Sequence, residues 1–128
     1  MKRILYIGLS GTGKTLFAQR EMCRGDMSKA VVLGGRAAYQ WQGLLPTENI
    51  FGCAGSNLIR KLADADMMIV DDWESLRNEG VASFADLMPI VERFKGNDLV
   101  VLGQEGYEER KMLKFDEIRV CMPRCQTG

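Results

Sequence analysis

The sequence predicts an α/β fold with a mainly parallel sheet of about five strands flanked by helices, in one domain that spans residues 1–128. Short apolar runs alternate with stretches of helical periodicity, which is typical of parallel strands joined by crossover helices. A glycine-rich segment lies between the first apolar run and the first helical stretch. The 128 residues suffice for one hydrophobic core, and a content of 46% apolar and 27% charged residues is typical of a globular protein.

Strands are expected where short apolar runs occur, because strands of a parallel sheet are buried on both faces. The first run, RILYI, comes directly before the glycine-rich segment. Two later runs end in polar residues, since MMIV leads into two aspartates and LVVLG leads into a glutamine. In chain order, five strands are expected at residues 3–7, 29–34, 66–72, 99–104 and 116–123, and residues 49–53 could form a further short strand.

Helices are expected at residues 14–23, 57–65 and 83–95. Ser56 is a candidate N-cap of the second helix, because a serine hydroxyl can accept a hydrogen bond from the first helical turn. Apolar residues recur at helical spacing from Phe84 to Phe94, and Pro89 among them predicts a kink or a late start of the third helix. The stretch 35–48 should be irregular, since Pro46 breaks any helix there.

The segment from Gly8 to Thr15 reads G-L-S-G-T-G-K-T, a complete match to the pattern G-x-x-x-x-G-K-[ST] of phosphate-binding loops. Glycines let successive backbone N–H groups point at phosphate oxygens, and the helix that follows adds the positive end of its dipole. Lys14 would reach the β- and γ-phosphates, and the Thr15 hydroxyl would bind Mg²⁺. We therefore expect ATP and Mg²⁺ as cofactors. The expected nucleotide-binding residues are Gly8, Ser10, Gly11, Thr12, Gly13, Lys14, Thr15 and Leu16.

The run MMIV followed by Asp71 and Asp72 resembles a Walker B motif. In that motif the first carboxylate binds Mg²⁺ and the next one polarises the attacking water. The resemblance therefore implies that Asp71 is a metal ligand, together with Thr15, and that Asp72 is catalytic. The commoner motif has glutamate in the second position, and aspartate is one methylene shorter. Glu74 is the residue that could substitute for Asp72.

Gln104 ends an apolar run, and we expect it between the phosphate loop and the Walker B strand, where its amide could orient the attacking water. Lys14, Asp72 and Gln104 are thus the expected catalytic residues. The order of phosphate loop, Walker B motif and glutamine resembles the RecA-like branch of P-loop ATPases. Within that branch the sequence is most similar to the FtsK/HerA group, which includes DNA translocases, viral packaging ATPases and Zot-like phage assembly ATPases. The resemblance implies ATP hydrolysis that powers a DNA-associated motor or an assembly or packaging process.

Two other functions stay open. Nucleoside and nucleotide kinases also begin with a strand, a phosphate loop and a helix, and the C-terminal part resembles thymidine kinases in having cysteines after a glycine-containing loop. Here, however, Cys121 and Cys125 form a C-x3-C pair without a second pair, and the sequence has no histidine. Whether this pair binds a metal is left open. The third alternative is a switch or loader that binds ATP and acts through a partner.

The formal net charge is zero, so a single copy has no long-range field that attracts nucleic acid. We expect a homo-oligomer that contacts DNA through an assembled ring. Hydrolysis in a ring would need an arginine from the adjacent subunit, for which Arg77 and Arg110 are candidates. The chain is short for the FtsK/HerA group, and its apolar runs are too short to span a bilayer. We therefore expect no transmembrane segment and a cytoplasmic location, that of the host cell if the protein is viral.

The segment GGRAAYQWQG places Arg36, Tyr39 and Trp41 after the second expected strand, at the end of the sheet where ligands bind in α/β proteins. A charge between two aromatic rings could contact bases, a nucleobase or a neighbouring subunit. The alternative is that Tyr39 and Trp41 pack the loop onto the core, and this interpretation is slightly favoured.

Overall fold

The computed structural model describes residues 1–9, 13–78 and 83–121 and has an α/β architecture. Six strands of the described chain form one sheet in the order β3-β2-β4-β5-β1-β6, and each neighbouring pair is parallel. The predicted fold class is confirmed, with six strands where about five were expected. The strands are β1 (Lys2–Ile7), β2 (Ala30–Leu33), β3 (Ile50–Phe51), β4 (Met67–Asp71), β5 (Asp98–Gly103) and β6 (Glu117–Val120).

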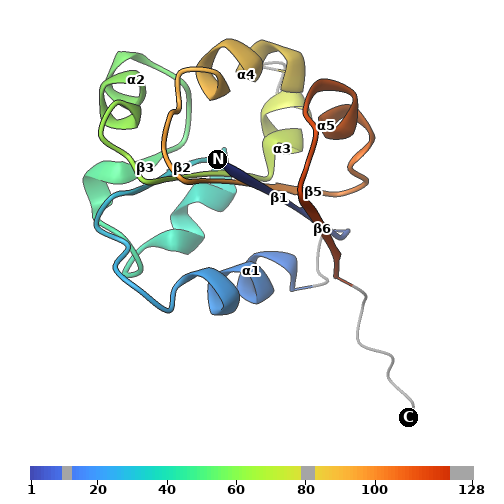
Figure 1. Cartoon of the computed structure of the whole chain (residues 1–128), viewed down its shortest axis with the longest axis horizontal. Coiled ribbons are helices and arrows are strands. Elements are labelled where there is room, and N and C mark those ends of the chain that lie inside the picture. The colour runs from blue at the N-terminus through green and yellow to red at the C-terminus, as the bar shows by residue number, and fades with distance from the viewer. Residues whose placement is uncertain (10–12, 79–82, 122–128) are drawn as a thin grey trace.

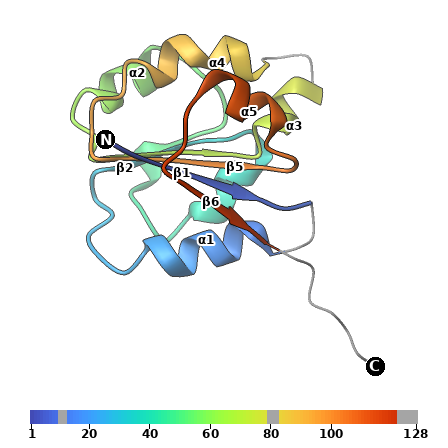
Figure 2. The ribbon, with the colours of Figure 1, turned by 45° about the vertical axis from the view of Figure 1, so that its right-hand side comes forward.

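Helices cover both faces of the sheet (Figure 1). The helix α1 (Lys14–Met22) lies on one face, together with the short 3-10 helices η1 (Arg36–Trp41) and η2 (Thr47–Asn49). The opposite face carries the remaining helices, and Figure 2 shows the same two layers from another side. These helices are α2 (Ser56–Leu62), α3 (Trp73–Asn78), α4 (Phe84–Val91) and α5 (Tyr107–Met112).

The strands supply a core on each face because successive side chains point in opposite directions. Ile4 and Tyr6 of β1 belong to the core that includes Ala18 of α1 and Trp41 of η1. Leu5, between them in sequence, belongs to the core beneath α2, α3 and α4. The central strands are therefore buried on both sides, which explains why their sequences are continuous apolar runs rather than alternating ones.

The ends of two helices differ from the prediction. The N-cap of α2 is Gly55, so the predicted Ser56 cap is wrong, and Ser56 is the first helical residue. The helix α4 starts with a capping box, in which the Ser83 hydroxyl accepts from the backbone N–H of Asp86 and the Asp86 carboxylate accepts from the N–H of Ser83. Pro89 lies inside α4, which ends at Val91 instead of continuing to residue 95.

The strand β5 lies between β1 and β4. Its last residue, Gly103, is in register with Ile7 of β1, and Leu102 is in register with Asp71 of β4. The carboxyl ends of the three strands therefore meet at one edge of the sheet. This places Gly8 after β1, Asp71 and Asp72 at the end of β4 and Gln104 after β5 at the same edge, so Gln104 lies between the other two segments as the sequence predicts.

Candidate nucleotide-binding site

The helix α1 begins at Lys14, directly after Gly13, whose φ of 77° is in the left-handed region that favours glycine. The Lys14 side chain is only 8% exposed, and its Nζ donates a hydrogen bond to the Gly8 carbonyl oxygen over 2.9 Å. The lysine side chain thus reaches back to the end of β1, where Gly8 begins the predicted phosphate loop. The side chain of Leu16 is exposed. The remaining predicted loop residues, Ser10, Gly11 and Thr12, lie outside the described residues.

Thr15, in the first turn of α1, reaches across to the end of β4. Its hydroxyl donates to Asp71, with Oγ1 3.1 Å from Oδ2 and 3.4 Å from Oδ1. Asp71 has no exposed surface, and burial raises the pKa of its carboxyl to about 6. Hydrogen bonds from Trp41 and Thr15 and the charge of Lys14 act in the opposite direction. The two predicted metal ligands are therefore neighbours, although 56 residues separate them in the sequence.

Trp41 is a further residue of this site, whereas the sequence suggested for it packing on the core or contact with bases, a nucleobase or a neighbouring subunit. Its ring is fully buried, and its indole Nε1 donates to Asp71 Oδ2 over 2.9 Å. The preference for packing is therefore confirmed for Trp41 but wrong for Tyr39, which is 63% exposed. Nothing in the spacing of the sequence indicates that Trp41 meets Asp71, because the two belong to different elements. The side chain of Arg36 lies outside the described part of the structure.

Asp72 has an unusual backbone conformation for a residue other than glycine, with a φ of 53°. Its carboxylate accepts a hydrogen bond from the Ser75 hydroxyl, and its carbonyl accepts from the Ser75 N–H. The side chain thus faces the first turn of α3. In this arrangement Asp72 makes the turn that leads from β4 into the helix.

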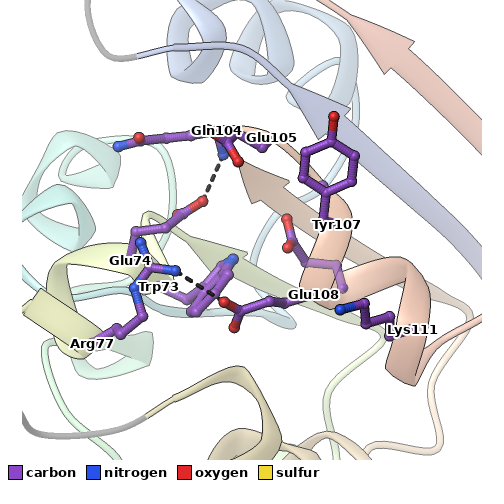
Figure 3. A pocket seen from close by; sticks show the side chains of 10 residues that line it. Trp73, Glu74, Arg77, Gln104, Glu105, Tyr107, Glu108 and Lys111 are labelled. Atoms are coloured by element: carbon purple, nitrogen blue, oxygen red, sulfur yellow. Dashed lines mark hydrogen bonds and ion pairs between the residues drawn. The ribbon is translucent and has the colours of Figure 1, made fainter.

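Glu74 follows in the first turn of α3 and is only 4% exposed. Its Oε2 accepts a hydrogen bond from the backbone N–H of Gln104 over 2.6 Å (Figure 3). Burial raises the pKa of Glu74, whereas this hydrogen bond and the charge of Lys14 lower it. The structure therefore brings Gln104 next to Glu74 through its main chain.

The two arginines predicted to act on a neighbouring subunit are both held within the chain. Arg77 forms an ion pair with Glu108, with Nη1 3.1 Å from Oε1, and its guanidinium lies over the ring of Trp73. Arg110 donates from Nε to the Gly106 carbonyl oxygen over 3.0 Å. Both side chains are exposed, so these contacts are weak and would not prevent either arginine from meeting a partner.

Cys121 is partly buried at the end of the described chain, and Cys125 lies outside it. Among the described residues, no group of three or more histidine, cysteine, aspartate or glutamate side chains could hold a metal ion. Nor does any helix in the described ranges have the length and apolarity that crossing a membrane requires.

No protein-family model matches the chain, and no curated protein matches it. Among solved structures, the chain is similar to a chain in the structure of Drosophila ORC bound to DNA, with a TM-score of 0.48 and 19% sequence identity. That match covers 94% of this chain and only 37% of the Drosophila chain. A likeness of this degree gives no support to the FtsK/HerA resemblance of the sequence.

Proposed function

We propose that the protein is a P-loop nucleoside triphosphatase that binds Mg²⁺–ATP at the carboxyl edge of its sheet and hydrolyses it. The observation that carries the proposal is the contact of Thr15 with Asp71 next to the buried Lys14. Burying the Lys14 ammonium and the Asp71 carboxylate is costly, and within the described structure their hydrogen-bond partners are uncharged. A phosphate chain and a cation between these side chains would supply charged partners.

The residues present fit Mg²⁺ by their chemistry. Mg²⁺ prefers hard oxygen ligands and takes one or two of them from protein, usually with phosphate oxygens and water. The Thr15 hydroxyl and the buried Asp71 carboxylate are ligands of this kind. When bound, the ion would neutralise negative charge on the phosphates. Asp71 and Thr15 would hold it, and Trp41 would fix the orientation of the carboxylate.

Lys14 would bind the phosphates directly. Its ammonium group has three N–H donors, and one of them is used by the Gly8 carbonyl oxygen. Among the described residues the Gly8 oxygen is its one hydrogen-bond acceptor, so the other two donors could bind phosphate oxygens without loss of that bond. The start of α1 adds backbone N–H groups and the positive end of the helix dipole.

Two carboxylates compete for the role of activating the attacking water. The sequence favours Asp72, but its carboxylate is bound to the Ser75 hydroxyl in its own turn. Glu74 is buried, is held by the Gln104 N–H, and experiences the charge of Lys14. We therefore propose that Glu74 acts as the base and that Asp72 shapes the turn.

Steady-state turnover of ATP tests this assignment. Glu74→Gln should lower kcat by about 10²-fold or more, the scale of a lost general base, while ATP affinity stays nearly constant. Asp72→Asn should have a much smaller effect. If Asp72→Asn abolishes turnover and Glu74→Gln does not, the two roles are reversed. If wild type and both variants hydrolyse ATP equally, the protein is not a hydrolase of this type.

The process that hydrolysis serves is proposed to be a DNA-associated motor or an assembly process, with a nucleoside kinase as the alternative. Incubation with γ-labelled ATP distinguishes the two, first with DNA and then with a mixture of nucleosides. A motor should release labelled phosphate faster when DNA is present. Transfer of the label to a nucleoside, with no effect of DNA, would instead identify a kinase.

A further inference from the structure

A polar pocket lies between α3, the turn after β5 and α5, and it shares Glu74 and Gln104 with the candidate nucleotide site (Figure 3). Its volume is about 240 Å³, and Glu74 and Glu109 both line it. Glu109 is only 1% exposed, and Glu74 is nearly as buried. Within the described structure, Oε1 of Glu74 and Oε2 of Glu109 have no hydrogen-bond partner. Two buried carboxylates of the pocket lining thus each have one oxygen without a hydrogen-bond partner in the described structure.

The two carboxylates lie close together because Gly103 leaves room for them. A Cβ atom at Gly103 would lie 1.9 Å from Glu109 Oε2 and 3.4 Å from Glu74 Oε2. Any other residue at this strand end would therefore push the Glu109 carboxylate aside. The negative charge of Glu109 also disfavours the ionised form of Glu74.

The side chains around the pocket leave an excess of negative charge. Its lining contains four glutamates and only two cations, Arg77 and Lys111. Arg77 is bound to Glu108 on the exposed rim and is not among the partners of Glu109. Like charges in a low-dielectric site are costly unless a proton or a cation lies between them.

We propose that this pocket binds a guanidinium group between Glu74 and Glu109. A guanidinium is planar, presents several N–H donors in a fixed fork and is weakly hydrated, so it suits two adjacent buried carboxylates. The volume of the pocket is enough for the group and part of an aliphatic stem. A metal ion fits less well, since the described residues contain no group of three or more ligating side chains suited to one. The guanidinium belongs either to a small molecule or to an arginine of a second copy of this chain.

The binding is measured without nucleotide, so its failure would leave the proposed ATP site untouched. Agmatine is titrated into the purified chain by calorimetry, with putrescine, which has the same charge but an ammonium in place of the guanidinium, as the control probe. Agmatine should bind one-to-one and more tightly than putrescine. Glu109→Gln should weaken agmatine binding at least tenfold, and Glu109→Asp, which keeps the charge, should weaken it less. Glu92→Gln makes the same charge change at an exposed position outside the pocket and should have no effect.

Several outcomes would overturn the proposal. They are no agmatine binding to the wild type, equal affinity of wild type and Glu109→Gln, and binding of Mn²⁺ at the pocket with no binding of agmatine. If Glu74 and Glu109 only share a proton, agmatine should not bind. In that case a pH titration should show one proton fewer bound by Glu109→Gln than by the wild type. Circular dichroism of each variant checks that it is folded.

Sedimentation velocity distinguishes the two sources of the guanidinium. If an arginine of a second copy fills the pocket, the chain should self-associate, and agmatine should shift it toward monomer. If the source is a small molecule, agmatine should bind with no change in mass. Either result retains the guanidinium site that the calorimetry establishes.

Discussion

Asp71 receives hydrogen bonds from two elements that are distant in the sequence, from Thr15 at the start of α1 and from Trp41 at the end of η1. The phosphate-loop pattern and the apolar run before Asp71 were enough to predict that Thr15 and Asp71 belong to one site. The Trp41 contact could not be predicted, because an indole N–H carries no sequence signal for its acceptor. The sequence also does not predict where the Asp72 side chain points, because its positive φ depends on the turn into α3.

Trp41→Phe should weaken the Mg²⁺-dependent part of ATP binding by about tenfold. Phenylalanine keeps the ring in the core but removes the donor to Asp71, and a hydrogen bond to a charged group contributes about 1.5–3 kcal/mol. Titration of Mg²⁺ at fixed ATP measures the change. Trp73→Phe is the matched control, because the Trp73 N–H has no partner within the described structure. Equal effects of the two substitutions would show that the hydrogen bond does not matter.

Asp71 should also make the stability of the free protein depend on pH. The folded-state pKa of about 6 is above the ordinary value of 3.8, so the folded protein binds the proton more tightly than the unfolded chain. The stability from this group is complete below pH 4 and is lost as the pH rises through 6, by up to about 3 kcal/mol.

Urea unfolding at several values between pH 4 and 7, without Mg²⁺ or nucleotide, measures this effect. The free energy of unfolding of the wild type should fall relative to that of Asp71→Asn, which has the same shape and no charge. Parallel pH profiles of the two proteins would contradict the raised pKa.

At the scale of elements, the strands were predictable and the short helices were not. Continuous apolar runs such as MMIV identify buried strands, whereas α3 and α5 have six residues each, less than two helical turns. A segment that short has no periodicity to detect, and its conformation depends on the sheet edge on which it packs. The helix α4 was predictable in place but not in length, since its last turn ends soon after Pro89.

The capping box of α4 gives a test at this scale. Ser83→Ala removes the side chain that accepts from the Asp86 N–H and should lower the free energy of unfolding by about 1 kcal/mol. Ser56→Ala is the matched control, because Ser56 makes no cap hydrogen bond in α2. Chemical unfolding of the two variants measures the difference. A loss of the same size in both would show that the α4 cap contributes nothing specific.

For the whole molecule, the sheet order explains why the candidate site forms at all. Because β5 lies between β1 and β4, the carboxyl ends of these three strands lie side by side at one edge of the sheet. The polar residues at the ends of the three strands therefore come together there. The class of fold and the position of the candidate site at this edge were predictable from the sequence. The pocket between α3 and α5 was not predictable, because it depends on two helices that the sequence pattern does not reveal and on the missing side chain of Gly103, which leaves room for Glu109.

A neutral chain should bind DNA only as an assembly. With a formal net charge of zero, one copy should have weak affinity, and several copies together should bind in a way that falls steeply with salt. Sedimentation velocity should show ATP-dependent oligomers, and DNA should raise the ATPase rate of those oligomers. Lys14→Ala should show neither effect. A wild-type protein that stays monomeric with ATP and ignores DNA would contradict the motor role.

The central claim is that Mg²⁺–ATP binds between the glycine-rich loop, Lys14 and the Thr15–Asp71 pair. Calorimetric titration of ATP in the presence of Mg²⁺, into wild type and Lys14→Ala, tests it most directly. The wild type should bind one ATP, and Lys14→Ala should bind it at least about 10²-fold more weakly while its unfolding curve is unchanged, since the lysine would no longer contact the β- and γ-phosphates. Equal ATP affinity of the two folded proteins would contradict the claim.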